Sequence, residues 1–319
     1  TSSIEGEGMR KRVLISVDIG TQGTKAAAVD LEGNIVAEAF QASNLITPRP
    51  GVVEEDPREM LSSVINTIKA VVERLGSAEV LAVGVDGQMA GILGIGADGE
   101  AVTHYDSWLD TRCEPYITMM KEKAGDLLVQ TTGAPPSYTH GPKILWWKHE
   151  RPEVYAQIAK FVVPSAYVVG RLVGLTGDEA YQDYTYLHFS GFADARNTKW
   201  SAELMDLFKV TPDKLPRIVV PWQVMGGLTQ SMATLCGLPS GTPVVAGCGD
   251  SAATSLGAGI TRPGQLFDVA GTASIFSCCV DRYAPDVTNK TLLYARSVVP
   301  DLWIPMAYIN GGEIGRAHV

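Results

Sequence analysis

Cysteine and histidine are scarce in this chain of 319 residues, and neither forms a recognisable cluster. The five cysteines include no CxxC pair, and the five histidines are equally unpaired. An odd number of scattered cysteines argues against a disulfide framework and against a cysteine-rich zinc site. We therefore expect reduced, buried thiols in a protein of the cytoplasm.

Long basic runs and long apolar runs are also missing. Lys and Arg number 26 against 35 Asp and Glu, for a formal net charge of -9, and the longest basic run is Arg10-Lys11-Arg12. Nucleic acids and anionic membranes ordinarily bind basic surfaces, so neither is expected as a partner. The most apolar region, 161–175, is interrupted by Pro164 and Arg171 and cannot span a membrane. Small molecules are the expected ligands.

The N-terminal residues lack the basic and apolar regions of a signal peptide. We interpret residues 1–8 as an added tail ahead of a native start at Met9. The length that remains suits about two domains, each of roughly 100–200 residues.

The first part of the chain predicts a sheet followed by a helix and another strand. The predicted strands of an antiparallel meander are 13–19, 25–30 and 34–42. A helix then begins with Asp56 as N-cap and Pro57 in its first position, and ends before Gly76. Residues 80–85 are apolar without alternation, which is typical of a buried parallel strand.

Further along, strands and helices continue to alternate. The predicted elements are a hairpin of 92–95 and 101–104, helices at 143–149 and 153–159, a strand at 161–163, a helix from about 201 to 208, a strand from 243, a small-residue helix at 251–259, and a second hairpin of 265–270 and 274–280. We place a change of domain near 245–262.

A glycine-rich turn follows the first strand and predicts a phosphate site. Its residues are Gly20, Thr21, Gln22, Gly23, Thr24 and Lys25. The glycines let the backbone approach a ligand, and the N–H groups and threonine hydroxyls can surround phosphate oxygens. Asp18, at the strand end, would orient a magnesium ion, and Lys25 would add positive charge. The alternative is an ordinary hairpin with an exposed aspartate.

A second turn of the same kind lies between the last two predicted strands. It consists of Gly271, Thr272, Ala273 and Ser274. Two such hairpins facing one another across a cleft would hold a polyphosphate from both sides.

Asp250 ends a predicted strand and begins a helix of small residues. A carboxylate at a helix N-terminus stays ionised and can accept the proton of a hydroxyl that attacks a γ-phosphate. The alternative is that Asp250 caps the helix, as Asp often does. Its position alone favours the cap.

Five short motifs occur in the order and approximate spacing of the FGGY carbohydrate kinases. They are 18–25, 87–89, 108–112, 247–250 and 271–274. The chain resembles this family from about residue 12 to about residue 312, and most of all its xylulokinase-type members. The resemblance implies an α/β, ribonuclease-H-like fold of the actin/hexokinase type, with one complete domain and the start of a second. Sugar and magnesium-ATP would bind between them.

The resemblance also implies roles for individual residues. Asp250 would be the general base, the two hairpins would hold the phosphates of ATP, and Asp18 would lie near the metal. The implied sugar-binding residues are Gln88, Met89, Trp108, Asp110 and Arg112. These side chains suit a polyol, because Asp accepts from hydroxyls, Arg donates to them and an aromatic ring covers the C–H face. The implied reaction is ATP-dependent phosphorylation of a ketose or polyol, with D-xylulose or a related pentulose first.

Two features depart from the family. Ala90 stands where xylulokinases carry a histidine, which leaves the choice among ketoses and polyols open. The chain is also shorter than family members, whose adenine pocket lies in the C-terminal part. We therefore assign 9–250 to the sugar-binding domain, 251–312 to the beginning of a truncated nucleotide-binding domain, and 313–319 to a tail that fits the family poorly. We expect this chain alone to be inactive, and a homodimer is compatible with the resemblance.

Three other functions compete with the kinase. Residues 244–252 resemble the strand, G-x-G-x-x-A turn and helix of an NAD(P)-binding oxidoreductase, but Asp250 would lie beside the pyrophosphate. The segment 249–251 suggests a serine hydrolase, but the only later histidine is His318. A non-catalytic actin-like ATPase would share the hairpins, but it would not need the cluster at 108–112.

Overall fold

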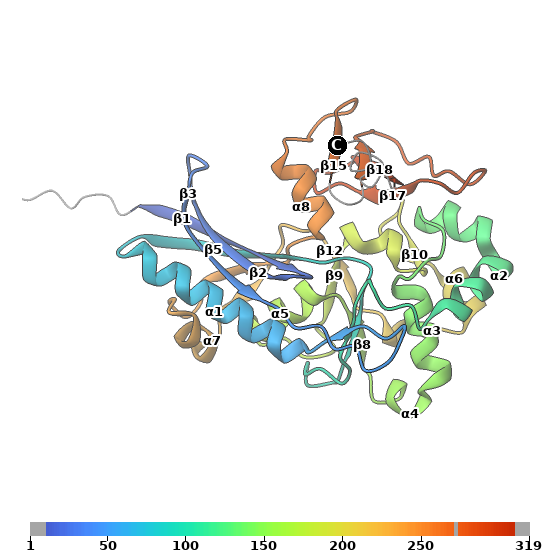
Figure 1. The fold of residues 1–319 in the computed structure, drawn as a ribbon, viewed down its shortest axis with the longest axis horizontal. Helices are drawn as coiled ribbons and strands as arrows, with labels where there is room; N and C mark the ends of the chain where they lie inside the picture. The colour runs from blue at the N-terminus through green and yellow to red at the C-terminus, as the bar shows by residue number, and fades with distance from the viewer. Residues whose placement is uncertain (1–10, 271–273, 310–319) are drawn as a thin grey trace, which may run out of the picture.

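The structure, a computed structural model, describes residues 11–270 and 274–309 and is built around a six-stranded sheet (Figure 1). The strand order is β13-β14-β5-β1-β2-β3. These strands are β1 (Arg12–Gly20), β2 (Gly23–Asp30), β3 (Ile35–Ala42), β5 (Glu79–Gly87), β13 (Val224–Gly227) and β14 (Pro243–Val245). β1, β2 and β3 pair antiparallel, and β5 runs parallel to both β1 and β14. The predicted meander and parallel strand are confirmed.

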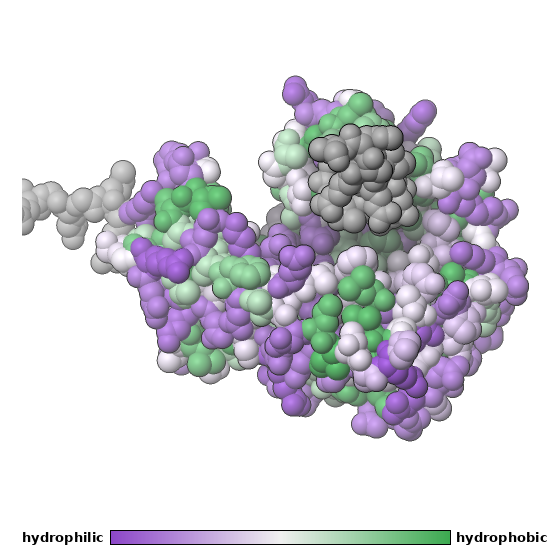
Figure 2. Space-filling view, viewed as in Figure 1, coloured by the Kyte–Doolittle hydropathy of each residue, from purple (hydrophilic) through white to green (hydrophobic). Residues whose placement is uncertain are grey.

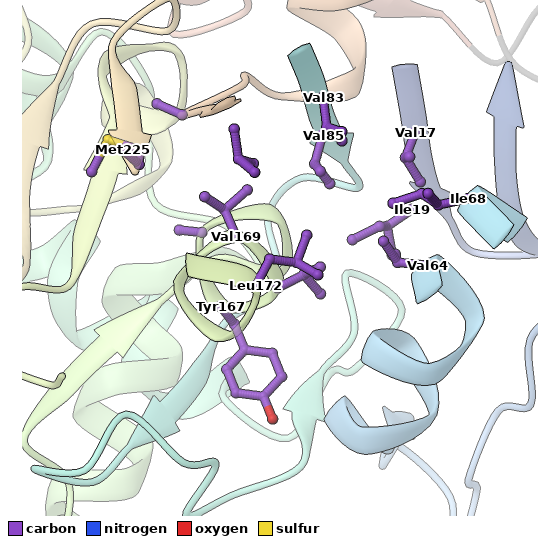
Figure 3. Packing of buried hydrophobic residues seen from close by; sticks show 14 of the residues in the cluster. Val17, Ile19, Val64, Ile68, Val83, Val85, Tyr167, Val169, Leu172 and Met225 are labelled. Atoms are coloured by element: carbon purple, nitrogen blue, oxygen red, sulfur yellow. The ribbon is translucent and has the colours of Figure 1, made fainter. Parts of the chain in front are cut away.

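One face of this sheet is covered by α1 (Pro57–Leu75) and α5 (Pro164–Val173). The Asp56 carboxylate accepts a hydrogen bond from the backbone N–H of Arg58, and Gly76 follows the last turn, as predicted. Strand β1 alternates strictly, with every second side chain buried. In Figure 3 side chains from β1 and β5 point toward those of α1 and α5, and Val64 and Ile68 of α1 are fully buried.

The opposite face of the sheet is open. Leu14 of β1 is 44% exposed, and Ile35 and Phe40 of β3 are 59% and 63% exposed. Figure 2 shows apolar surface over this part of the molecule. Asp18 lies on the same open face as Leu14, because side chains two residues apart in a strand point to the same side. The face that carries Asp18 is therefore accessible in this chain.

A second layer of helices and short strands continues the first domain. It contains α2 (Glu114–Thr132), α3 (His140–Glu150), α4 (Pro152–Tyr155) and α6 (Ala202–Phe208), whereas α7 (Gln230–Cys236) packs beside α1. Its short strands are β4 (Glu54–Glu55), β6 (Leu93–Ile95), β7 (Tyr105–Asp106), β8 (Lys160–Val162), β9 (Tyr181–Asp183), β10 (Ala193–Asp194), β11 (Lys199–Trp200) and β12 (Arg217–Val219), with 3₁₀ turns η1 (Tyr184–Phe189) and η2 (Pro212–Lys214).

Two predictions in this layer are wrong. The segment 92–95 does not form a hairpin with 101–104, because β6 pairs with β8 and makes only a single bridge to Ala101. Backbone bonds close the turn, from Gly96 to Glu100 and from Val102 to Gly94, but the N–H of Gly94 donates to the Thr103 hydroxyl, so the ladder goes no further. The helix predicted at 153–159 is only the short α4, since Lys214 donates to the carbonyls of Tyr155 and Ile158 and ends it there.

The C-terminal part begins a second sheet, shown with α8 at the top of Figure 1. Its order is β15-β16-β18-β17, and all of its strands pair antiparallel. Its elements are α8 (Asp250–Gly257), β15 (Leu266–Ala270), β16 (Ser274–Cys278), β17 (Leu293–Arg296) and β18 (Trp303–Ile309). The second predicted hairpin is confirmed, although Gly271, Thr272 and Ala273 lie outside the described residues. Tyr294 and Trp303 pack against Tyr184, which joins this sheet to the first domain.

All five cysteines are free, and four of them are buried. Within the ranges that the structure describes, no helix combines the length and the apolar character needed to cross a bilayer.

The packing of α1 on the sheet predicts a large effect of one substitution. Ile68→Ala removes a fully buried side chain and should lower the free energy of unfolding by about 2–5 kcal/mol. Urea denaturation measures this change. Lys69→Ala, on the exposed side of the same helix, is the control and should stay within about 0.5 kcal/mol of the unmodified chain. Equal effects of the two substitutions would contradict the packing described.

Candidate active site

Three carboxylates meet at one edge of the main sheet. The parallel register of β1 and β5 places Asp18 beside Asp86, and Gly87 bridges to Gly249, directly before Asp250. The carboxyl ends of parallel strands share one edge, which is where α/β sheets bind ligands. Asp18 and Asp250 were predicted from the sequence, whereas Asp86, whose partner is 68 positions away in the chain, was not. The only local sign of Asp86 is a carboxylate at the end of an apolar strand.

The three carboxylates shift the pKa values of two members of the cluster. Burial, together with the charges of Asp18 and Asp250, raises the pKa of Asp86 well above its usual range. Burial raises the pKa of Asp250 to about 6, although hydrogen bonds from the Ser251 N–H and hydroxyl oppose that rise. Asp250 is therefore largely ionised at pH 7, as a general base must be.

This edge fits a magnesium ion. Among the residues described, none of the three carboxylates pairs with a Lys or Arg side chain. Their oxygens do not form a complete three-ligand cage in the described ranges. Mg²⁺ ordinarily binds through one or two carboxylates and keeps several waters, so Asp18 and Asp86 are ligands of the right type, and a cation there would favour the ionised form of Asp86.

Asp250 does not cap its helix. Gly249 occupies the N-cap position, and Asp250 is the first residue of α8. Its side chain instead accepts from Ser251, at 2.6 Å from the backbone nitrogen. The alternative in which Asp250 serves only as the cap is therefore wrong.

A buried chain of hydrogen bonds fixes the turn that carries Asp250. The backbone N–H of Gly249 donates to the Thr185 hydroxyl oxygen at 2.9 Å, and that hydroxyl donates to the Asp183 carboxylate at 2.5 Å. Tyr186 donates to the Gly87 carbonyl at 3.0 Å. These residues were not predicted, because the sequence of 178–200 shows no clean helical or strand periodicity.

The predicted phosphate hairpin divides its side chains between two directions. The Thr21 hydroxyl accepts from the Trp108 indole N–H at 2.8 Å, whereas the Thr24 hydroxyl is buried against Ser63 of α1. Lys25 pairs with Glu38 of β3 at 2.6 Å. The hydroxyl of Thr24 thus faces the core, and the turn around Gly20, Gln22 and Gly23 remains as the candidate phosphate contact. In the second hairpin only Ser274 lies within the described residues, as the first residue of β16.

The turn after β5 brings one of the predicted sugar-binding residues, Met89, against Gly249, the neighbour of Asp250. Met89 packs on Gly249 so closely that a Cβ added there would lie 2.6 Å from the Met89 side chain. Ala90 follows with a left-handed φ of 67°. Gln88 itself is buried, and its side-chain amide donates to Glu55 at 2.8 Å.

Asp110 and Arg112 do not face a cavity. The Asp110 carboxylate has no exposed surface and accepts from the Val53 N–H at 2.8 Å and from the Arg112 guanidinium at 2.6 Å. Arg112 also donates to Glu54 at 2.6 Å. The buried Lys143 ammonium donates to the carbonyl of Asp110 at 2.9 Å. Both carboxylate oxygens of Asp110 are already paired, so they are not free to bind a sugar in this structure. These hydrogen bonds instead hold the loop that carries Trp108.

A large cavity adjoins this loop. Its volume is about 1330 Å³, and its lining includes Ala90, Trp108, Leu109, Tyr138, Phe189 and Lys290. Trp108 is 46% exposed, with its indole N–H turned to Thr21. Tyr138 and Phe189 were not predicted. A polar and aromatic wall of this kind suits a polyhydroxylated ligand.

Comparison with known proteins places the chain in a family. The sequence model described as "FGGY family of carbohydrate kinases, N-terminal domain" matches residues 13–257. The chain belongs to the FGGY family of carbohydrate kinases. Among curated relatives, a xylulose kinase of Bacillus subtilis (strain 168) is 30% identical over 289 residues, which cover 88% of this chain and 56% of the relative. A gluconokinase of the same organism is 23% identical over 94% of this chain and 58% of the relative.

Solved structures agree on the fold. A ligand-bound xylulose kinase from Lactobacillus acidophilus superposes with a TM-score of 0.88 at 24% identity, covering 95% of this chain and 61% of its own. A glycerol kinase from Plasmodium falciparum with ADP gives 0.87 at 19% identity, covering 98% and 64%. The ribonuclease-H-like fold of FGGY kinases is confirmed. The chain spans less than two thirds of these relatives.

The geometry does not support the rival functions. The oxidoreductase pattern needs a carboxylate about 20 residues after the glycine turn, at the end of a parallel strand. Asp268 is at that distance, but it lies within β15, which pairs antiparallel with β16. The Ser251 hydroxyl donates to Asp250 at 3.2 Å, and no histidine is its partner in the described ranges.

The bond between Thr185 and Gly249 predicts a stability effect. Thr185→Val leaves the buried Gly249 N–H without an acceptor and should lower the free energy of unfolding by about 1–3 kcal/mol. Thr234→Val, at an exposed hydroxyl in α7, is the matched control. The two variants are compared by urea denaturation. An unchanged midpoint for Thr185→Val would show that the hydrogen bond between Gly249 and Thr185 does not hold the turn.

Proposed function

We propose that the protein containing this chain transfers the γ-phosphate of ATP to a hydroxyl of a ketose or polyol. The observation that carries the proposal is the buried contact of Met89 with Gly249, which places Ala90 of the cavity wall one residue from a side chain that packs beside the ionised Asp250. Xylulose kinases and gluconokinases are among the relatives, and D-xylulose or a related pentulose is our first choice of acceptor. Because Ala90 stands where xylulokinases carry a histidine, other ketoses and polyols remain candidate acceptors.

The proposed chemistry needs a base and a well-positioned nucleophile. Asp250 accepts the proton of the acceptor hydroxyl while the oxygen of that hydroxyl attacks the γ-phosphorus in line. The bond from that phosphorus to the β–γ bridging oxygen breaks, and ADP leaves. Asp18 and Asp86 would hold the magnesium ion, which supplies neutralisation of phosphate charge. Asp250 then releases its proton to solvent.

Several finer assignments belong to the same proposal. We assign residues 9–250 to sugar binding and 251–312 to the start of the nucleotide-binding domain, with the turns at 20–25 and 271–274 toward the ATP phosphates. Free thiols support a cytoplasmic location.

The role of Asp250 is tested by Asp250→Asn in the protein that contains this chain. The amide cannot accept the proton, so sugar-dependent formation of ADP should fall about 10²–10⁴-fold, with acceptor binding retained. Asp178→Asn, at an exposed aspartate, should leave the rate unchanged. Retained turnover in Asp250→Asn would remove this residue from the mechanism.

The acceptor class is tested by thermal unfolding of the 319-residue chain with D-xylulose, ribulose, ribitol, erythritol, glycerol or gluconate. An acceptor at ten times its Kd should raise the Tm by about 2–4 °C. NAD(P) should give no shift. Stabilisation by NAD(P), with none by any polyol, would contradict the kinase and favour an oxidoreductase.

A further inference from the structure

Glu55 is a buried carboxylate with no place in the chemistry described so far. It lies in β4, directly opposite Tyr105 of β7, and is 2% exposed. One of its oxygens, Oε1, accepts from the Gln88 side-chain amide at 2.8 Å, while Oε2 has no partner in the described residues. Burial raises the pKa of Glu55 to about 7. A buried, half-satisfied carboxylate is costly to a fold, so packing alone does not account for it.

Glu55 ends a chain of hydrogen bonds that crosses the candidate site. Its amide partner, Gln88, accepts from the Thr21 hydroxyl at 3.3 Å, and Thr21 accepts from the Trp108 indole N–H at 2.8 Å. The four residues come from β4, the turn after β5, the hairpin after β1 and the loop before α2. These hydrogen bonds therefore link the wall of the cavity to the hairpin that is proposed to bind phosphate.

The donors and acceptors of this chain allow only one direction. An indole N–H can only donate, so the Thr21 oxygen accepts from Trp108 and its single proton goes to the Gln88 carbonyl. The Gln88 NH₂ group must then face Glu55, whose Oε1 accepts from it. The donor-only indole at one end and the accepting Glu55 Oε1 at the other fix the amide of Gln88 and the hydroxyl of Thr21 between them.

We propose that Glu55 is a positioning residue for acceptor recognition, which sets the Gln88 amide and, through Thr21, the Trp108 ring at the cavity wall. The inference rests on the proposed sugar-kinase function. Glu55 itself touches no reacting atom.

The test is a double-mutant cycle between Glu55→Met and Trp108→Phe in the protein that contains this chain. Each substitution breaks the series of hydrogen bonds at one of its ends. Each should therefore raise the acceptor KM about tenfold, with kcat changed less than about threefold. The double variant should be no worse than the worse single variant, because the second substitution removes a link that is already lost. Glu55→Gln, which keeps an acceptor oxygen but permits a flipped amide, should fall between Glu55→Met and the unmodified protein.

Thr67→Val is the matched control, because it removes a buried hydroxyl that bonds only within α1. It should leave the acceptor KM unchanged. Additive effects of Glu55→Met and Trp108→Phe, or a Glu55→Met protein with the acceptor KM of Thr67→Val, would overturn the inference. If Glu55→Met does not fold, Glu55→Gln takes its place in the cycle with the same criterion of additivity.

A second measurement separates this inference from the proposed function. In the 319-residue chain, the NMR signal of the Trp108 indole N–H, assigned with Trp108→Phe, should move in Glu55→Gln and stay in Thr67→Val. If the protein shows no kinase activity toward any ketose or polyol, the proposed function is wrong. A shifted indole signal would still support the series of hydrogen bonds. An unmoved signal would refute that chain even in an active kinase.

Discussion

The parallel pairing of β5 with β1 and β14 is the constraint on which the rest of the site depends. It brings the ends of three strands to one edge, and with them Asp18, Asp86 and the turn before Asp250. Glycines at this edge are required by contact: a Cβ on Gly247, whose φ is 76°, would lie 1.8 Å from the Val85 carbonyl oxygen. The close approach of the backbones at this edge sets the position of the turn that carries Asp250.

Buried polar groups then orient what the sheet brings together. Thr185 and Asp183 fix the turn before Asp250, and the Asp110–Arg112 pair with Lys143 fixes the loop that carries Trp108. Each group is costly to bury unless it is paired, and most of these are paired. The acceptor wall is thus held by groups that do not themselves touch the cavity.

Local chemistry made part of the structure predictable. The Asp56 cap, Pro57 and the apolar spacing defined α1, and glycine-rich turns between apolar segments defined both hairpins. Long-range contacts could not be read in the same way: β6 pairs with β8, some 67 positions away, and Asp86 meets Asp18 only through the sheet. Nor does sequence spacing tell which way a side chain faces, which is why Thr24 and Asp110 were expected at ligands and lie buried.

The central claim is that the strand-end carboxylates and the cavity lined by Ala90 and Trp108 form a single site for phosphoryl transfer. The most direct measurement is a crystal structure of the protein that contains this chain, with an acceptor sugar and a non-hydrolysable ATP analogue. The account predicts an acceptor hydroxyl within hydrogen-bond distance, about 2.6–3.2 Å, of an Asp250 carboxylate oxygen. A sugar bound away from Asp250, or a terminal phosphate remote from that edge of the sheet, would contradict it.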